Sequence, residues 1–175
     1  MKHILICGAR GVGKSTLIAK LIAGIDAPLY GYFTKRLDKA DDDGLFPIYL
    51  YPAWVKDEER ERGKENMIGR CSGKMHDVHA EVFDRFGAKY IRAAKPGGVI
   101  IMDELGFMER NAEEFKSAVF SALDGDIQVI AAVKDRYDVE FLNAVRAHEK
   151  AQVFNITEQN RDSLYGEILP LIAKI

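Results

Sequence analysis

Short apolar runs alternate along the chain with longer segments whose apolar residues recur every three or four positions. The runs have the length and composition of buried strands, and we predict strands over residues 3–7, 99–102, 127–133 and 152–156. The longer segments predict helices over residues 14–24, 77–95, 139–148 and 162–174. Strands and helices that alternate in this way indicate an α/β domain with a mostly parallel central sheet and helices on both faces.

The segment between the first two predicted helices has the pattern of antiparallel strands. Residues 30–37 and 46–51 are strand-like, and the turn-rich residues 38–44 between them indicate a β-hairpin inserted into the domain. Residues 67–75 predict one further short strand. Residues 54–65 are dense in charge, which indicates an exposed loop or a fraying helix.

Three of the predicted helices carry boundary signals. Pro96 ends the helix over residues 77–95, whose apolar face would consist of Val78, Val82, Phe83, Phe86, Tyr90 and Ile91. The helix that follows the 99–102 strand begins after Asn111, which we expect to cap it with Glu114 as its capping-box partner. Gly24 is the expected cap at the end of the first helix.

Length and composition narrow the classes of protein. The chain has 175 residues with no repeat or linker, so we expect residues 1–175 to form one domain. A net charge of -2 leaves no basic excess for a phosphate backbone, so no nucleic-acid partner is expected. The apolar run at residues 4–7 is too short for a signal peptide or a membrane span, so no membrane association is expected. Cys7 and Cys71 are distant and predict reduced thiols in a cytoplasmic protein.

The turn between the first predicted strand and helix matches the phosphate-binding pattern G-x-x-x-x-G-K-[ST]. The matching residues, with the threonine that follows, are Gly8, Ala9, Arg10, Gly11, Val12, Gly13, Lys14, Ser15 and Thr16. The glycines let consecutive N–H groups point at phosphate oxygens, and the positive end of the following helix points at the same place. Lys14 would reach the β- and γ-phosphates, and the Ser15 hydroxyl would be a ligand of Mg²⁺. The pattern predicts a site for a nucleoside triphosphate, whether ATP, GTP or another.

Two acidic residues follow the apolar run at 99–102. An aspartate at the end of such a strand holds the metal in P-loop proteins. Adjacent residues at a strand end point to opposite sides, so Asp103 and Glu104 would have different roles. We expect Asp103 to hold Mg²⁺ and Glu104 to polarise the water that attacks the γ-phosphate, which makes hydrolysis the natural reaction.

Four segments in this order resemble a small nucleoside-triphosphatase family first described from thermophiles. They are residues 8–16, Gly31-Tyr32-Phe33-Thr34, Asp103-Glu104-Leu105-Gly106-Phe107-Met108-Glu109 and Asn160-Arg161-Asp162, beside the family's P-loop, G-F-Y-T, D-E-I-G-x-M-E and N-R-D. The resemblance implies a three-layer, RecA-like P-loop NTPase fold, Mg²⁺ as cofactor, Glu104 as the water-activating residue and slow hydrolysis of several nucleoside triphosphates. The chain departs from the family at Phe107, where lysine is common, and at residues 43–46, which lack its Arg-x-Gly-Phe segment.

Two arginines are candidates for contact with the γ-phosphate. Arg36 ends the 30–37 strand and is our candidate arginine finger supplied from the same chain, a catalytic role beside Lys14 and Glu104. Arg10, inside the loop, could serve instead. For each, the alternative is a solvated surface arginine.

Three more residues are placed by motif position. Asn160 and Arg161 follow the last predicted strand, where loops of open α/β sheets meet their ligand. An arginine that stacks on the base would tolerate any base, while helix capping by Asn160 or Asp162 is an equally good account. Glu109 either supports the metal and water network, as the resemblance implies, or is an exposed acid.

A structural zinc site is not expected, because a fourth ligand is lacking near Cys71, His76 and His79.

The same residues leave three functions open. A Mg²⁺-dependent triphosphatase with broad base tolerance is the leading hypothesis. A small-molecule or nucleotide kinase needs a second substrate pocket and an arginine-rich lid, and residues 56–65 carry Arg60 and Arg62 among four glutamates that would repel phosphates. A nucleotide-switched accessory protein in cofactor metabolism would use the same residues with a protein partner, which the sequence does not identify.

Overall fold

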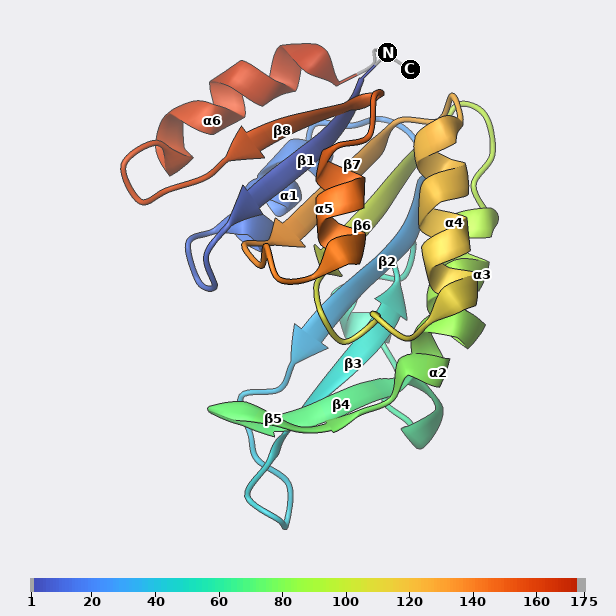
Figure 1. Ribbon diagram of the computed structural model, residues 1–175, viewed down its shortest axis with the longest axis vertical. Coiled ribbons are helices and arrows are strands. Elements are labelled where there is room, and N and C mark those ends of the chain that lie inside the picture. The colour runs from blue at the N-terminus through green and yellow to red at the C-terminus, as the bar shows by residue number, and fades with distance from the viewer. Residues whose placement is uncertain (1, 173–175) are drawn as a thin grey trace.

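One sheet of eight strands runs through the molecule, and helices cover both of its faces (Figure 1). The computed structural model describes residues 2–172. The strands are β1 (His3–Gly8), β2 (Leu29–Arg36), β3 (Phe46–Pro52), β4 (Met67–Ser72), β5 (Lys74–Val78), β6 (Val99–Leu105), β7 (Val129–Lys134) and β8 (Ala151–Asn155). The α-helices are α1 (Lys14–Ile22), α2 (Ala80–Val82), α3 (Ala88–Arg92), α4 (Glu113–Asp124), α5 (Glu140–Arg146) and α6 (Arg161–Ile168). A π-helical segment, Phe83–Gly87, joins α2 to α3, and 3₁₀ turns cover Asp57–Glu59, Lys64–Asn66 and Leu169–Leu171.

The strand order is β5-β4-β3-β2-β6-β7-β1-β8. Strands β2, β6, β7, β1 and β8 pair in parallel, while β3, β4 and β5 extend the β2 edge by antiparallel pairing. The predicted class, a mostly parallel sheet with helices on both faces, is confirmed. Strand β7 lies between β1 and β6, so the carboxyl ends of these three strands meet at one edge of the sheet.

The core has two layers because alternate residues of each parallel strand face opposite sides of the sheet. In β1, Leu5 and Cys7 belong to the cluster beneath α3, α4 and α5, whereas Ile4 and Ile6 belong to the cluster beneath α1 and α6. All four side chains are almost fully buried. Burial on both faces explains why the strands read as continuous apolar runs.

The antiparallel extension is larger than the predicted hairpin. The hairpin of β2 and β3 forms as expected, but residues 67–75 hold all of β4 and the start of β5, because the chain reverses at Gly73, whose φ is +81°. Ser72 and Lys74 face each other across this turn. A positive φ of this kind favours glycine, and the resulting β4–β5 pair carries the chain on to Val78.

The predicted 77–95 helix is therefore wrong at its start. Asp77 and Val78 belong to β5, and the Val78 side chain is 43% exposed rather than part of an apolar face. Asp77 pairs with Arg70 in the β4–β5 ladder and accepts a hydrogen bond of 2.5 Å from its Nε. Helical structure begins at Ala80, and Val82, Phe83 and Ile91 are buried as predicted.

The start of α4 also differs from the expected capping box. The capping position is Ala112, no side chain caps it, and Glu114 instead pairs with Arg92 at 2.8 Å. The Phe115 N–H donates to Asp84 of the π-helical segment at 2.9 Å. The first turn of α4 is therefore capped by the Asp84 carboxylate of a neighbouring segment, and not by the local capping box that we predicted from Asn111 and Glu114.

The first and last helices are shorter than the segments predicted from the spacing of apolar residues. The first ends at Ile22 with Ala23 as its cap, so Gly24 is not the cap. The last runs from Arg161 to Ile168 and continues into the turn at Leu169–Leu171, while Lys174 of the predicted segment lies outside the described residues. Within residues 2–172, the helices are all too short or too polar to cross a membrane.

Candidate active site

The loop that joins β1 to α1 has the conformation that its glycines predict. Gly11 and Gly13 adopt φ values of +80° and +113°, which favour glycine strongly. A side chain at Gly8 would lie 2.7 Å from the Ile156 carbonyl oxygen, so the loop also packs closely against the segment after β8. Helix α1 begins at Lys14 and directs its amino end into the loop. The geometry is that of a phosphate-binding loop.

The Lys14 side chain is buried and uses its ammonium group for three contacts. Its Nζ donates to the carbonyl oxygens of Gly8 and Ala9, both at 2.8 Å, and forms an ion pair with Glu104 Oε2 at 3.0 Å. An ammonium group has three donors, so these contacts satisfy it. The Gly8 and Ala9 carbonyls and the Glu104 carboxylate thus accept from the same three N–H groups of Lys14 that a triphosphate would use.

Ser15 and Asp103 provide two neighbouring oxygen groups. The Ser15 Oγ donates to Asp103 Oδ1 at 3.0 Å, and burial raises the pKa of this carboxyl to about 6. Mg²⁺ prefers oxygen ligands and is commonly held by one or two protein groups together with phosphates and water. The oxygens of Ser15 and Asp103 fit Mg²⁺ as ligands.

The zinc candidates of the sequence do not form a metal site. Residues 2–172 contain no group of three or more His, Cys, Asp or Glu side chains arranged to hold a metal. His76, one of the candidates, instead forms a hydrogen bond of 2.7 Å with Ser72 Oγ.

Glu104 lies between two lysines. Its other carboxylate oxygen, Oε1, is 3.2 Å from Lys134 Nζ. Asp103 contacts Ser15, whereas Glu104 contacts Lys14, so the two carboxylates have different partners at the start of α1. The register between β6 and β7 shifts at this point, between Met102 and Leu105. The result is a chain of alternating charges from Lys14 through Glu104 to Lys134.

Lys134, the last residue of β7, and Arg136, two residues further on, were not singled out from the sequence. Both cations lie near the ring of Phe107, with Lys134 Nζ at 5.2 Å and Arg136 Cζ at 5.5 Å from its centroid. The signal was a Lys-Asp-Arg run at the end of a predicted parallel strand. Its meaning depends on β7 lying between β1 and β6, and the sequence alone does not reveal that order.

Arg10, Arg36 and Glu104 line one cleft of about 770 Å³. The guanidinium of Arg36 lies 4.8 Å from the centroid of the Phe46 ring. Neither arginine forms an ion pair with any residue in the range 2–172. The structure therefore brings both arginine candidates and the candidate water-activating residue to one opening.

Asn160 and Arg161 have different surroundings. Asn160 accepts from the Thr157 N–H at 2.7 Å and donates to the Asn155 carbonyl at 2.9 Å, so its side chain shapes the loop after β8 and does not cap α6. Arg161 shares a small cleft of about 190 Å³ with Gly13 and Thr16. Of the two, Arg161 is the one placed beside the phosphate-binding loop.

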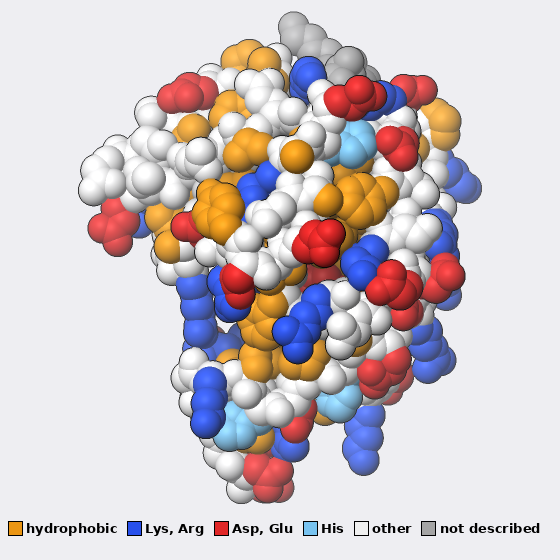
Figure 2. All heavy atoms as spheres, viewed as in Figure 1, with side chains coloured by type: hydrophobic (Ala, Val, Ile, Leu, Met, Phe, Trp, Pro, Cys, Tyr) orange, Lys and Arg blue, Asp and Glu red, His pale blue; other side chains and the backbone are white. Residues whose placement is uncertain are grey.

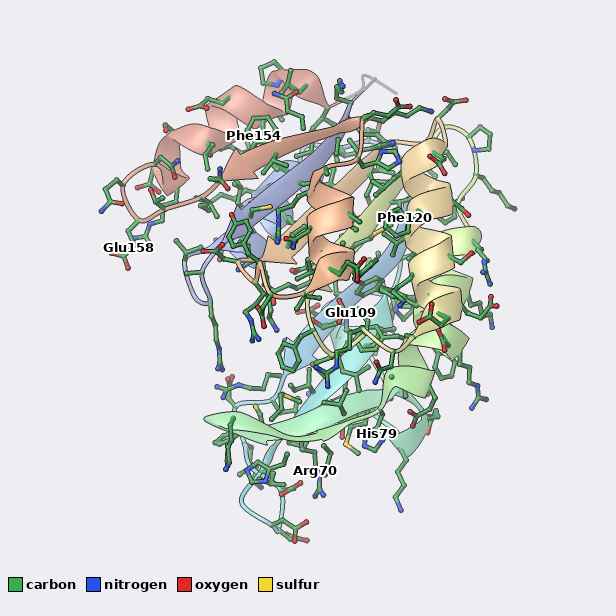
Figure 3. All side chains as sticks on the ribbon, in the orientation of Figure 1. Arg70, His79, Glu109, Phe120, Phe154 and Glu158 are labelled. Atoms are coloured by element: carbon green, nitrogen blue, oxygen red, sulfur yellow. The ribbon has the colours of Figure 1, made fainter. Side chains whose placement is uncertain are left out.

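Glu109 is buried near the centre of the molecule (Figure 3), so the exposed-acid alternative is wrong. Its carboxylate accepts a hydrogen bond from the Gly106 N–H and so closes the loop that follows Glu104. Burial raises the pKa of this carboxyl to about 7.

The P-loop, the acidic end of β6 and the parallel sheet between two helical layers together define a P-loop nucleoside-triphosphatase fold. The model of the NTPase family matches residues 3–169, and the chain belongs to that family. This confirms the resemblance found in the sequence.

Several relatives and two solved structures are similar to this chain over 95–98% of its length. A Thermotoga petrophila protein named nucleoside-triphosphatase THEP1 is 30% identical to this chain, and the match covers 95% of this chain and 90% of the relative. A protein of the same name from Methanosarcina barkeri is also 30% identical, and that match covers 96% of this chain and 95% of the relative. The crystal structure of THEP1 from Aquifex aeolicus superposes with a TM-score of 0.77 at 22% identity, covering 98% of this chain and 99% of that one. A human cancer-related nucleoside triphosphatase superposes with a TM-score of 0.69, also at 22% identity, over 98% and 97%.

Removal of the Lys14 cation tests the phosphate site. We expect Lys14→Ala to weaken triphosphate binding at least about 30-fold, because a charged hydrogen-bonding partner of the phosphates contributes roughly 2 kcal/mol. Titration calorimetry with ATP measures the affinity, and Lys95→Ala on an exposed lysine is the control. Equal affinities in the two variants would contradict the assignment.

The raised pKa of Glu109 predicts a pH dependence of stability. The folded state holds this proton more tightly than the unfolded chain, so Glu109 stabilises the fold fully below about pH 4.5, and this contribution is lost as pH rises through about 7. In Glu109→Gln, the free energy of unfolding should fall less between pH 4.5 and 8 than in the parent, by roughly 1–3 kcal/mol. Urea unfolding at several pH values measures this, with exposed Glu149→Gln as control. Parallel pH curves for Glu109→Gln and the parent would refute the burial argument.

Proposed function

We propose that this chain is a Mg²⁺-dependent nucleoside triphosphate hydrolase that converts NTP to NDP and phosphate. The observation that carries the proposal is the position of Glu104, a carboxylate in direct contact with the phosphate-loop lysine and at the edge of an open cleft. Family membership and the names of the relatives agree with this reaction.

Phosphate binding would begin with an exchange of partners at Lys14. The carbonyls of Gly8 and Ala9 and the Glu104 carboxylate hold its ammonium in the loop. Phosphate oxygens carry more negative charge than carbonyls, and the loop N–H groups and the amino end of α1 also favour an anion. Lys14 would therefore turn from the loop to the β- and γ-phosphates. Glu104 would then keep Lys134 as its cationic partner.

Ser15 and Asp103 would hold Mg²⁺, which when bound neutralises charge on the β- and γ-phosphates. The 3.0 Å contact between their oxygens supports this pairing. Asp103 is 5% exposed, so the carboxylate is shielded from bulk water and depends on such partners for its charge.

Glu104 would activate the water. Once Lys14 contacts the phosphates, one Glu104 oxygen stays on Lys134 and the other is available to accept a proton. The water oxygen forms a bond to the γ-phosphorus, the bond to the bridging oxygen breaks, and NDP leaves while Glu104 takes the proton. Lys134 would keep the carboxylate in place during this step.

The remaining site residues would stabilise charge and hold the nucleoside. Arg36 is our candidate arginine finger and Arg10 the alternative, supported by their shared cleft with Glu104 and their lack of acidic partners among residues 2–172. Arg161 and Thr16 would flank the base, and the flat guanidinium would stack on any base. Buried, unpaired Cys7 and Cys71 suit a reduced, cytoplasmic setting.

Substitution of the two adjacent carboxylates should separate metal binding from water activation. Glu104→Gln keeps the shape but not the charge, so ATP binding should survive while the rate of phosphate release falls by about 10²–10⁴. Asp103→Asn should instead raise the Mg²⁺ concentration needed for half-maximal rate. Steady-state phosphate release measured over a series of Mg²⁺ concentrations distinguishes the two. A Glu104→Gln variant that hydrolyses ATP at the parent rate would exclude Glu104 as the partner of the water.

Base discrimination should be weak. Stacking on Arg161 does not distinguish base edges, so the kcat/KM values for ATP, GTP, CTP and UTP should lie within about tenfold, or ~1.4 kcal/mol. Competition between pairs of nucleotides in one reaction measures the ratios directly. A hundredfold preference would reveal a hydrogen-bonding reader of the base, contrary to the stacking proposal.

A further inference from the structure

The cleft that holds Glu104 extends well beyond the phosphate-binding loop. Arg10 and Gly11 form one side, and the antiparallel extension forms the opposite side through Ile48, Ile68 and Met75. Its volume of about 770 Å³ is within the range of pockets that hold small organic molecules. A water molecule accounts for only about 30 Å³ of liquid volume. The γ-phosphate and the water would occupy the part beside Arg10 and Glu104, so hydrolysis leaves the part lined by the antiparallel extension without a use.

The part of the cleft away from the loop is apolar. Ile68 and Phe83 are 1% exposed, Ile48 and Met75 pack partly buried against the same core cluster, and Met108 lies beside them. Figure 2 shows hydrophobic atoms in the hollow between the parallel half of the molecule and the β4–β5 extension, with basic side chains at its edges. An attacking water needs polar neighbours, so this surface suits the carbon skeleton of a second molecule.

The rim of this apolar part carries positive charge. Arg36 of β2 and Lys74 of β5 line the cleft, and neither forms an ion pair with any residue between positions 2 and 172. Lys134 and Arg136, on the opposite rim, already pair with Glu104 and Asp138. With Arg36 assigned to the γ-phosphate, Lys74 remains for the acceptor, and charge complementarity favours an organic anion whose negative group lies toward Lys74.

We propose that this apolar part of the cleft is an acceptor site for a small organic anion that carries a hydroxyl group. This inference rests on the proposed function, because it uses the same Glu104 and the same γ-phosphate. The acceptor oxygen forms a bond to the γ-phosphorus, the bond to the bridging oxygen breaks, NDP leaves and Glu104 takes the hydroxyl proton. Hydrolysis is then the reaction that occurs when water fills the acceptor site. The acceptor class is an aromatic or branched aliphatic alcohol with a carboxylate or phosphate group.

Two matched probes test the site on the full chain with ATP and Mg²⁺. The first, 4-methylbenzoate, has an aromatic body and an anion but no hydroxyl, and the second, 4-(hydroxymethyl)benzoate, adds the hydroxyl. We expect 4-methylbenzoate at millimolar concentration to inhibit phosphate release without competing with ATP. We expect 4-(hydroxymethyl)benzoate to give a phosphate ester, detected by ³¹P NMR.

Variants on one strand assign the effect to the cleft. Met75→Glu places a carboxylate on the apolar wall, and Lys74→Glu reverses a rim charge at an exposed position. Each should weaken binding of both probes about tenfold or more while hydrolysis without probe stays near the parent rate. Val78→Glu adds the same charge to the exposed end of β5, outside the cleft, and should leave both probe effects unchanged.

Three results would overturn the proposal. Probes that leave phosphate release unchanged, or that compete with ATP, would show that nothing organic binds there beside the nucleotide. Equal behaviour of Met75→Glu and Val78→Glu would place the probes elsewhere. Inhibition by both probes without any ester would make the pocket regulatory and not an acceptor site. If the parent releases no phosphate from any triphosphate, the proposed hydrolase function fails, and saturable 4-methylbenzoate binding that Met75→Glu removes still supports the pocket.

Discussion

A buried ammonium group needs partners at all times, and the rest of this site follows from how Lys14 meets that need. An unpaired buried charge is costly, and the acceptors of Lys14 are two carbonyls, of Gly8 and Ala9, and the Glu104 carboxylate. These partners come from the end of β1 with the residue after it and from β6, and the two strands are not neighbours in the sheet. Strand β7 separates them and contributes Lys134, the second partner of Glu104. The strand order therefore determines the electrostatics of the site.

The charges of the site are arranged so that each would still have a partner when phosphate binds. Lys14 can exchange three acceptors for phosphate oxygens, and Glu104 can release Lys14 because Lys134 remains. The carboxyls with raised pKa values, Asp103 and Glu109, are held by Ser15 and by the Gly106 N–H. Glu109 holds the loop that follows Glu104 through the Gly106 N–H, which gives this residue an indirect role in the geometry of the site.

The sequence was most informative where structure depends on neighbours in the chain. Gly11, Gly13, Lys14 and the Asp103–Glu104 pair were found because a strand–turn–helix segment and a strand end are local patterns. The β5 strand was missed because its residues also fit a helical pattern, and pairing with β4 decided between them. The capping of α4 was wrong because the acceptor, Asp84, comes from another element. Lys134 was missed because its role depends on the strand order. The Asn160 side chain does not cap α6 but accepts a hydrogen bond from the Thr157 N–H within the preceding turn.

The exchange of partners at Lys14 is the central claim, and a crystal structure with a non-hydrolysable ATP analogue and Mg²⁺ tests it directly. The account predicts that Lys14 Nζ lies within hydrogen-bond distance of the β- and γ-phosphate oxygens and more than about 4 Å from Glu104. It also predicts that Glu104 keeps its contact with Lys134. An analogue bound while Lys14 still contacts Gly8, Ala9 and Glu104 would contradict the account.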